Sequence, residues 1–131
     1  MAKIRVLLAD DHYSIVEQVR ITLGENFDIV GAVDNGQDAI VEVGRLNPDV
    51  LVIDISMPIL DGLRAVSQVR STNSRIKVVF LTVHHDQDFV AAAFSSGASG
   101  YVSKADVTTD LVPAIQEVLQ GHTYISQSIR V

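Results

Sequence analysis

The sequence predicts an α/β domain built on a doubly wound parallel sheet of five strands in the order 2-1-3-4-5. Two observations predict it. First, apolar runs rich in Val, Ile and Leu alternate strictly with segments of helical period. Second, the connections between them are short, and parallel neighbours need a helical crossover. Five strand–helix units are too few for a closed barrel, which needs eight. An open sheet of the 2-1-3-4-5 order is therefore expected.

Five segments have the composition of strands. They are continuous apolar runs rather than alternating ones, which is typical of parallel strands covered on both faces. The run "VLVI" before Asp54 is the clearest example. The predicted strands span residues 3–9, 27–33, 49–54, 76–82 and 99–102.

Each predicted strand is followed by a segment whose apolar residues recur at helical spacing. Asp86 is a candidate N-cap for the fourth helix. Pro113 fits the fifth helix only in or just past its first turn, and Gly121 marks the end of that helix. The predicted helices span residues 14–23, 38–46, about 63–70, 86–96 and 110–120.

Composition limits the class of protein. The chain has 131 residues, 47% hydrophobic and 20% charged, which suits one compact domain. Its apolar runs are only of strand length, which argues against a membrane span. No secretory leader is visible and there is no cysteine. Together these features fit a cytoplasmic protein. The formal net charge of −6 and the scattered basic residues argue against direct binding to DNA phosphates.

Polar residues follow the predicted strands at their carboxyl ends, where ligands bind in an open parallel sheet. Asp34, after the second strand, is placed at the sheet edge and away from this crevice. The other strand ends bring three carboxylates, one hydroxyl and one ammonium to one rim: Asp10, Asp11, Asp54, Thr82 and Lys104.

Three carboxylates at one rim repel one another, by about 3 kcal/mol for a pair roughly 5 Å apart at an effective dielectric near 20. A hard divalent cation such as Mg²⁺ relieves this repulsion and is suited to oxygen ligands. Asp54 is then a candidate nucleophile that forms an acyl phosphate. Lys104 supplies a positive charge and Thr82 a hydroxyl donor to phosphoryl oxygens.

Four motifs occur in the order typical of one family: "LLADDH", "DVLVIDISMPILDG", "VVFLT" and "GASGYVSK". Together they resemble the receiver domains of response regulators over about residues 3–121. The "DDH" and the ending "GHTYIS" are similar to the NarL/LuxR-type subfamily. The resemblance implies a flavodoxin-like, CheY-like (βα)5 fold and a phosphorylation switch in two-component signalling.

The resemblance also implies individual roles. Asp54 matches the phosphoacceptor, which takes a phosphoryl group from a phosphohistidine of a sensor histidine kinase. Asp11 matches the direct Mg²⁺ ligand, Asp10 an acidic residue that acts through water, and the Ser56 carbonyl a further ligand. On the switch side, Thr82 matches the hydroxyl that moves toward the phosphoryl group, Tyr101 the aromatic that changes rotamer, and Lys104 the phosphoryl-binding lysine.

The same resemblance suggests a receiver domain at residues 1–121 and a tail, or the start of a linker, at 122–131. Subfamily members usually carry a helix-turn-helix domain next, which this sequence lacks, so DNA contact is expected only through an absent output domain. The resemblance, rather than any pattern in the sequence, suggests homodimerisation on phosphorylation. The activity expected of this chain is limited to Mg²⁺-dependent self-phosphorylation and slow autodephosphorylation.

Two residues depart from the family pattern. Val83 stands where a small residue usually follows the switch threonine, and we hypothesise that it slows hydrolysis or weakens phosphorylation. Ala105 stands where proline commonly follows the lysine, which leaves the geometry of that loop open.

Several alternatives remain open at this stage. A pseudo-receiver, a constitutive protein-interaction module without phosphorylation, is the rival function. A phosphohydrolase would need a second Asp where Ser56 stands. Asp10 or Asp11 can instead cap a helix, and Thr82 or Tyr101 can simply pack. His12 is interpreted as a capping or supporting residue, and a metal pair at His84 and His85 is disfavoured because adjacent side chains point apart.

Overall fold

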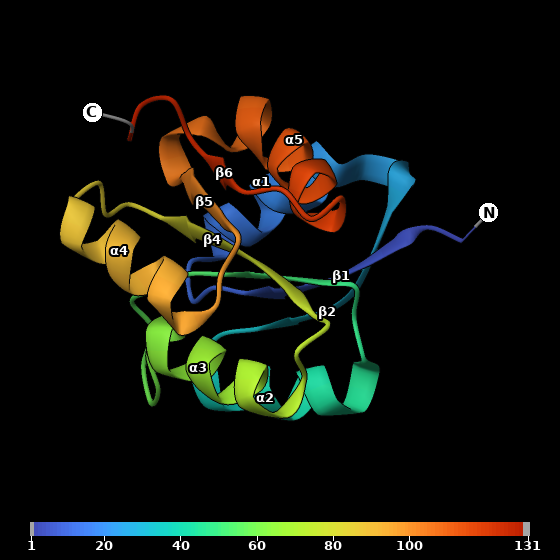
Figure 1. The fold of residues 1–131 in the computed structure, drawn as a ribbon. Coiled ribbons are helices and arrows are strands. Elements are labelled where there is room, and N and C mark those ends of the chain that lie inside the picture. Colours follow the sequence, from blue (N-terminus) through green and yellow to red (C-terminus); the bar gives the residue numbers. More distant parts are fainter. Residues whose placement is uncertain (1, 130–131) are drawn as a thin grey trace.

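The structure, a computed structural model, describes residues 2–129 and confirms the predicted α/β fold (Figure 1). Its parallel sheet has the order β2-β1-β3-β4-β5-β6. The predicted order 2-1-3-4-5 is thus correct, with one short strand added at the β5 edge. The strands are β1 (Ile4–Ala9), β2 (Phe27–Val33), β3 (Val50–Ile53), β4 (Lys77–Thr82), β5 (Gly100–Ser103) and β6 (Tyr124–Ile125).

The carboxyl ends of the central strands lie close together: β1 and β3 end level with each other, and β4 and β5 end together two residues further on. Ala9 of β1 pairs with Ile53 of β3, Ile53 pairs with Phe80 of β4, and Phe80 pairs with Tyr101 of β5. The residues that follow these strands therefore lie along one rim of the sheet.

Five α-helices form two layers on the sheet. They are α1 (Tyr13–Leu23), α2 (Gly36–Leu46), α3 (Gly62–Thr72), α4 (Gln87–Ser96) and α5 (Val107–Leu119). In Figure 1, α1 and α5 lie on one side of the sheet, while α2 and α3 lie on the other. Asp86 caps α4 as predicted, because its carboxylate accepts a hydrogen bond from the backbone N–H of Asp88.

Two hydrophobic cores explain the continuous apolar strands. Successive side chains of a strand point to opposite faces. In β3, Leu51 and Ile53 therefore join the core under α2, α3 and α4, whereas Val50 and Val52 join the core under α1 and α5. A strand buried on both faces has no polar face to show in its sequence.

The fifth helix differs from its prediction. It begins at Val107, three residues before the expected start, so Pro113 lies inside the helix rather than near its first turn. The reason is tertiary: Val107 and Leu111 are one turn apart and both fully buried against the sheet. Pro113 is exposed, so the Thr109 carbonyl that loses its intrahelical partner lies on the solvent side.

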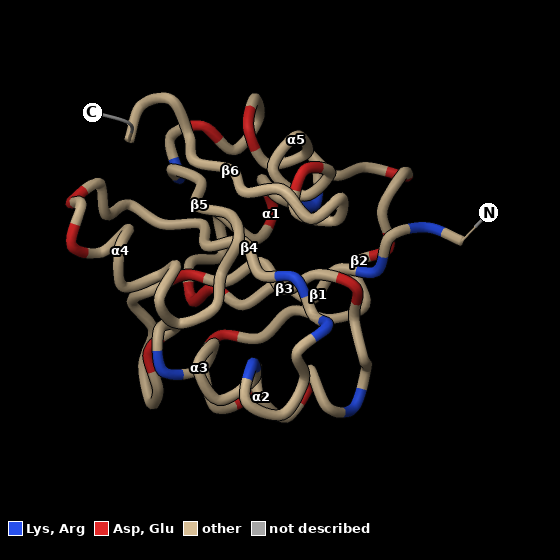
Figure 2. The backbone as a smooth tube through the Cα atoms, in the orientation of Figure 1, with Lys and Arg blue, Asp and Glu red and all other residues tan. Residues whose placement is uncertain are grey.

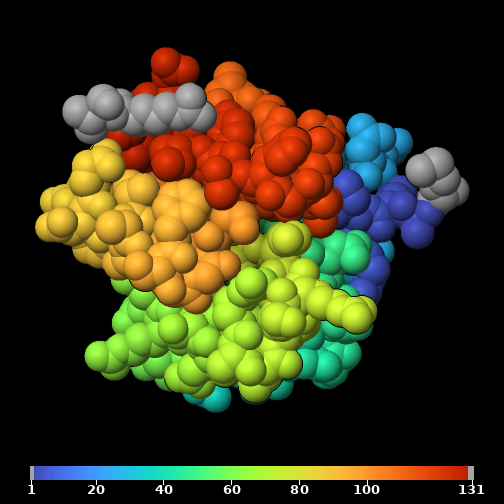
Figure 3. All heavy atoms as spheres, viewed as in Figure 1, coloured from blue at the N-terminus to red at the C-terminus, as the bar shows by residue number. Residues whose placement is uncertain are grey.

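The short strand β6 was not predicted. It pairs in parallel with β5, through Gly100 with Tyr124 and Tyr101 with Ile125. Figure 3 shows this red C-terminal segment lying against the orange residues that precede it in the chain. The Gln87 side-chain amide donates to the Ile129 carbonyl, which connects the segment to the start of α4.

Charge is distributed as the composition suggested. Figure 2 shows Lys and Arg at separate positions along the described chain rather than in one patch. None of the helices in residues 2–129 combines the length and the apolar character that crossing a membrane requires.

Candidate functional site: a buried acidic cluster at the strand ends

The site begins with two aspartates buried at neighbouring strand ends. Asp10 follows β1 and Asp54 follows β3, with exposed fractions of 3% and 2%. The Asp54 N–H donates to the Ala9 carbonyl at 2.9 Å, which fixes the two strand ends side by side. Because an isolated buried carboxylate is costly, a compensating cation is required here.

Lys104, which follows β5, supplies that cation. Its Nζ lies 2.9 Å from Asp10 Oδ2 and 2.9 Å from Asp54 Oδ2, and the lysine is only 9% exposed. Burial alone lowers the pKa of Lys104, but its contacts with the two carboxylates outweigh this effect and raise the pKa above the usual value. The sequence prediction that these three residues meet is correct.

Asp54 is held through both of its carboxylate oxygens. Oδ1 accepts a hydrogen bond from the Ile55 N–H at 2.7 Å, and Oδ2 accepts one from Lys104. The backbone here is close-packed, because a Cβ on Gly62 would lie 1.9 Å from the Asp54 carbonyl oxygen. Gly62 therefore lets α3 begin directly against the end of β3.

Asp11 and His12 form the solvent side of the cluster. Asp11 is exposed, and its Oδ1 lies 3.2 Å from Nδ1 of His12. The same ring nitrogen lies 2.9 Å from Asp10 Oδ1 and 3.9 Å from Asp54 Oδ2. His12 is the N-cap residue of α1, but its side chain makes no capping hydrogen bond. The imidazole is turned into the site instead, so of the two roles expected for His12 the structure favours the supporting one over the capping one.

The cluster fits a divalent cation by the chemistry of its donors. Asp10, Asp11, His12 and Asp54 each offer one ligand atom, and these atoms lie within 4.8 Å of one another. Apart from its ion pair with Lys104, the buried Asp10 Oδ2 accepts no hydrogen bond among residues 2–129. The carboxylates are the donors that hard cations prefer. The donor set therefore suits one hard divalent cation.

Thr82 and Tyr101 lie beside this cluster and share one neighbour. Thr82 is fully buried, and its Oγ1 accepts a hydrogen bond from the His84 N–H at 3.2 Å. The Tyr101 hydroxyl donates to the His84 carbonyl at 2.8 Å, with the ring fully buried. Burial and then the negative charge of Asp54 raise the pKa of Tyr101 to about 12.

The two adjacent histidines do not form a pair. Nε2 of His84 lies 2.8 Å from Ser56 Oγ, and its ring stacks on Phe89. Nε2 of His85 lies 2.9 Å from Ser103 Oγ. The expectation that adjacent side chains point apart is therefore correct.

Ser56 and Val83 both lie at the entrance to the site. Ser56 is exposed and lines a hollow together with Asp11. Val83 is 67% exposed and lines a smaller hollow with His12 and Lys104. The Val83 side chain thus borders the approach to the ammonium.

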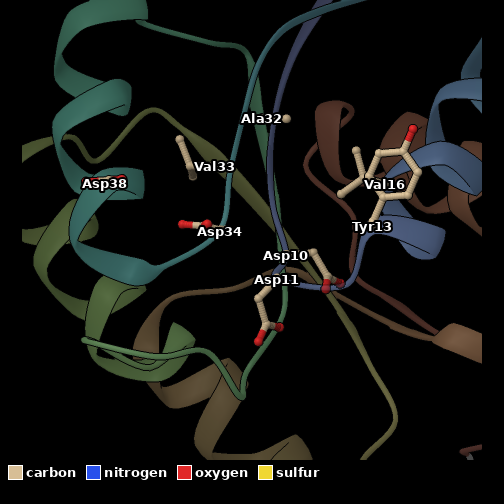
Figure 4. A pocket seen from close by; sticks show the side chains of 8 residues that line it. All are labelled: Asp10, Asp11, Tyr13, Val16, Ala32, Val33, Asp34 and Asp38. Atoms are coloured by element: carbon tan, nitrogen blue, oxygen red, sulfur yellow. The ribbon is translucent and has the colours of Figure 1, made fainter.

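Asp34 was expected at the sheet edge and away from the crevice. It does follow an edge strand and is not one of the four residues of the acidic cluster. It nevertheless lines a hollow together with Asp10, Asp11 and Asp38 (Figure 4). The reason is the strand order: β2 is an edge strand, but its neighbour is β1, so the two carboxyl ends adjoin. The acidic surface is wider than the sequence suggested.

The fold and this acidic pocket define a receiver domain of two-component signalling. Residues 6–116 match the family described as the response regulator receiver domain. The chain belongs to that family.

Relatives identify the NarL/LuxR-type branch. DegU, a transcriptional regulatory protein of Brevibacillus brevis, is 32% identical over 129 residues, which are 97% of this chain and 55% of DegU. A LuxR-family two-component response regulator from Aurantimonas sp. SI85-9A1 has a similar structure, with a TM-score of 0.92 and 28% identity over 98% of this chain and 93% of that one. The receiver domain of NarL from Mycobacterium tuberculosis gives a TM-score of 0.87 and 30% identity over 93% of this chain and all of that domain. The chain spans 55% to 60% of the length of the first curated relatives it matches.

Proposed function

We propose that this chain is a phosphorylation-operated switch that accepts a phosphoryl group on Asp54. The observation that carries the proposal is the convergence of Asp54, Asp10 and Lys104 at 2.9 Å contacts in a buried site. Such an arrangement places a carboxylate and a cation where a phosphoryl group can be received. A purely structural ion pair would not need Asp11 as a third acidic residue beside Asp10 and Asp54.

In the transfer step, a carboxylate oxygen of Asp54 attacks the phosphorus of a phosphohistidine. The new O–P bond forms as the P–N bond breaks, and the departing imidazole keeps the electron pair and takes up a proton. The Lys104 ammonium then moves toward the phosphoryl group, because the phosphoryl oxygens offer it stronger charge-assisted hydrogen bonds than the shared carboxylates do.

The acidic cluster would hold Mg²⁺ through Asp11, Asp54 and the Ser56 carbonyl, with Asp10 acting through water. When bound, the ion offsets the negative charge of both the carboxylates and the incoming phosphoryl group.

Thr82 and Tyr101 relay the change. The Thr82 hydroxyl now accepts from the His84 N–H, and a phosphoryl oxygen on Asp54 would be a new acceptor for its proton. Moving Thr82 disturbs the backbone at His84, whose carbonyl holds the Tyr101 hydroxyl. The two-state surface would comprise α4, β5 and α5.

The remaining parts of the proposal concern the whole protein. A sensor histidine kinase would be the phosphoryl donor, in the cytoplasm. Residues 1–121 would act as the receiver, with 122–131 as a tail or the start of a linker. The greater length of DegU, a transcriptional regulatory protein, supports a further output domain, which we propose to be a helix-turn-helix domain that controls transcription. Homodimerisation on phosphorylation is a further part of the proposal.

Incubation with acetyl phosphate and Mg²⁺, followed by intact mass measurement, tests the proposal. We expect the mass of one phosphoryl group to be added to the wild-type chain, lost in Asp54→Asn and retained in Asp28→Asn, a matched change at an exposed position. No added mass in the wild-type chain would support the pseudo-receiver instead. Continuous hydrolysis of phosphate esters would support the phosphohydrolase.

A further inference from the structure

The contacts of the His12 imidazole are not explained by hydrogen bonding alone. Nδ1 lies 3.1 Å from the Lys104 ammonium, which can only donate, and 2.9 Å from Asp10 Oδ1, which as a carboxylate oxygen can only accept. One ring nitrogen carries either a proton or a lone pair, so it satisfies one of these neighbours and opposes the other. Asp11 Oδ1, at 3.2 Å, is a second acceptor for the same single proton.

A shared cation resolves this conflict, since a lone pair on Nδ1 and the carboxylate oxygens then face the same positive charge. The distances agree with such sharing. Donor atoms bound about 2.1 Å from one octahedral ion lie about 3 Å apart as neighbours and about 4.2 Å apart as opposites. Nδ1 lies 3.2 Å from the Asp11 oxygen and 3.9 Å from the Asp54 oxygen, and both carboxylates are proposed as direct ligands.

The surroundings of His12 also allow an ion to reach it. The His12 side chain is 58% exposed, whereas the Asp10 and Asp54 side chains are nearly fully buried. The imidazole therefore lies between the buried carboxylates and solvent. An ion entering from solvent meets Nδ1 and Asp11 first.

We propose that His12 binds the metal ion directly through Nδ1, and that this nitrogen makes the site select a divalent transition-metal ion over Mg²⁺. The inference rests on the proposed function, because it concerns the same acidic cluster. Mg²⁺ takes oxygen ligands and keeps its waters, so it gains little from an imidazole. First-row transition metals accept imidazole nitrogen together with carboxylate oxygen, with affinities that rise from Mn²⁺ toward Cu²⁺.

Calorimetric titration of the whole chain with Co²⁺ and with Mg²⁺ tests the selectivity. Replacing His12 by Phe keeps a ring without a donor, and His12→Gln keeps a hydrogen-bond donor for the carboxylates without the imidazole. Both changes should weaken Co²⁺ binding by about tenfold or more and change Mg²⁺ binding by less than about twofold. Loss of a residue that only hydrogen-bonds a metal ligand already lowers metal affinity by about tenfold, so loss of a ligand should cost at least as much. His122→Ala removes another exposed histidine, outside the cluster, and should change neither affinity.

Pulsed electron paramagnetic resonance of the Mn²⁺-loaded chain gives a second readout. We expect a ¹⁴N coupling from a coordinated imidazole in the wild-type chain and in His122→Ala, and no such coupling in His12→Phe or His12→Gln. Equal losses of Co²⁺ and Mg²⁺ affinity in His12→Phe, or a wild-type spectrum without ¹⁴N coupling, would overturn the role of His12. Phosphorylation of His12→Phe with Mg²⁺ and acetyl phosphate would then still support the proposed function, whereas failure of the wild-type chain to bind either ion would overturn both.

Discussion

Replacing Lys104 by Met should destabilise the fold strongly, because it leaves two buried carboxylates without their cation. At an effective dielectric near 20, each 2.9 Å contact of the ammonium with Asp10 or Asp54 represents about 6 kcal/mol of attraction. Desolvation of the ions offsets much of this, and breaking a buried pair costs about 3–5 kcal/mol in practice. For a domain of this size we expect the melting temperature to fall by roughly 10–20 °C.

Urea unfolding at pH 7 with a chelator present measures this loss. Lys3→Met is the matched control, because Lys3 is exposed and its replacement should change the unfolding free energy by less than about 0.5 kcal/mol. Adding Asp10→Asn to Lys104→Met should restore roughly half of the lost stability, as expected for residues that act as one group. A Lys104→Met protein as stable as the Lys3→Met control would refute the reasoning.

The ion pairs of Lys104 with Asp10 and Asp54 also predict that the unfolding free energy falls at alkaline pH. The folded pKa of Lys104 is raised above its unfolded value of about 10.4, so its contribution is complete below that pH and is lost as pH rises through the folded pKa. The difference in unfolding free energy between wild type and Lys104→Met should therefore shrink above about pH 10.4. A constant difference up to pH 12 would contradict the ion pair.

Three further predictions concern the acidic cluster and its backbone. Without metal, Asp54→Asn should raise the melting temperature, because it removes one of three neighbouring carboxylates while Asp10 still pairs with Lys104. Added Mg²⁺ should then stabilise wild type more than the variant, and equal protection would mean that the cluster does not hold the ion. Gly62→Ala should destabilise the fold by about 1–3 kcal/mol or more through its clash with the Asp54 carbonyl. Gly44→Ala, with open space around its Cβ in a helix, should instead stabilise the fold by up to about 1 kcal/mol, and an equal effect of the two changes would exclude the close approach. Val83→Ala should change the dephosphorylation rate measured after acetyl phosphate is removed, and equal rates would dismiss a role for this side chain.

Much of the fold was predictable because its strands are buried on both faces. Continuous apolar runs such as Val50–Ile53 are typical of buried parallel strands when they alternate with helical segments. The strand ends of a parallel sheet define a rim without any knowledge of side chains. That is why the meeting of Asp10, Asp54 and Lys104 followed from the sequence.

The parts that were missed depend on tertiary contacts. The strand β6 has only two residues, Tyr124 and Ile125, which are too few for an alternating pattern to show in the sequence. It forms because its backbone pairs with that of β5. The early start of α5 depends on the burial of Val107. For His12 the sequence left a capping and a supporting role open. The turn of its ring into the cluster, which decides between them, depends on the backbone between Asp10 and α1, where Asp10 Oδ1 accepts the His12 N–H. The adjacent acidic residues in "DDH" were the one available signal for it.

The parallel pairing of β6 with β5 also bears on solubility. The Tyr124 N–H donates to the Ser99 carbonyl and the Ser126 N–H to the Tyr101 carbonyl, while Ser126 Oγ accepts from the Ser103 N–H. A chain shortened to residue 121 would leave these groups of β5 unpaired along an open edge. We would therefore expect such a shortened protein to self-associate edge to edge, and any trimming of this domain for crystallisation or display should retain residues up to at least Ile129.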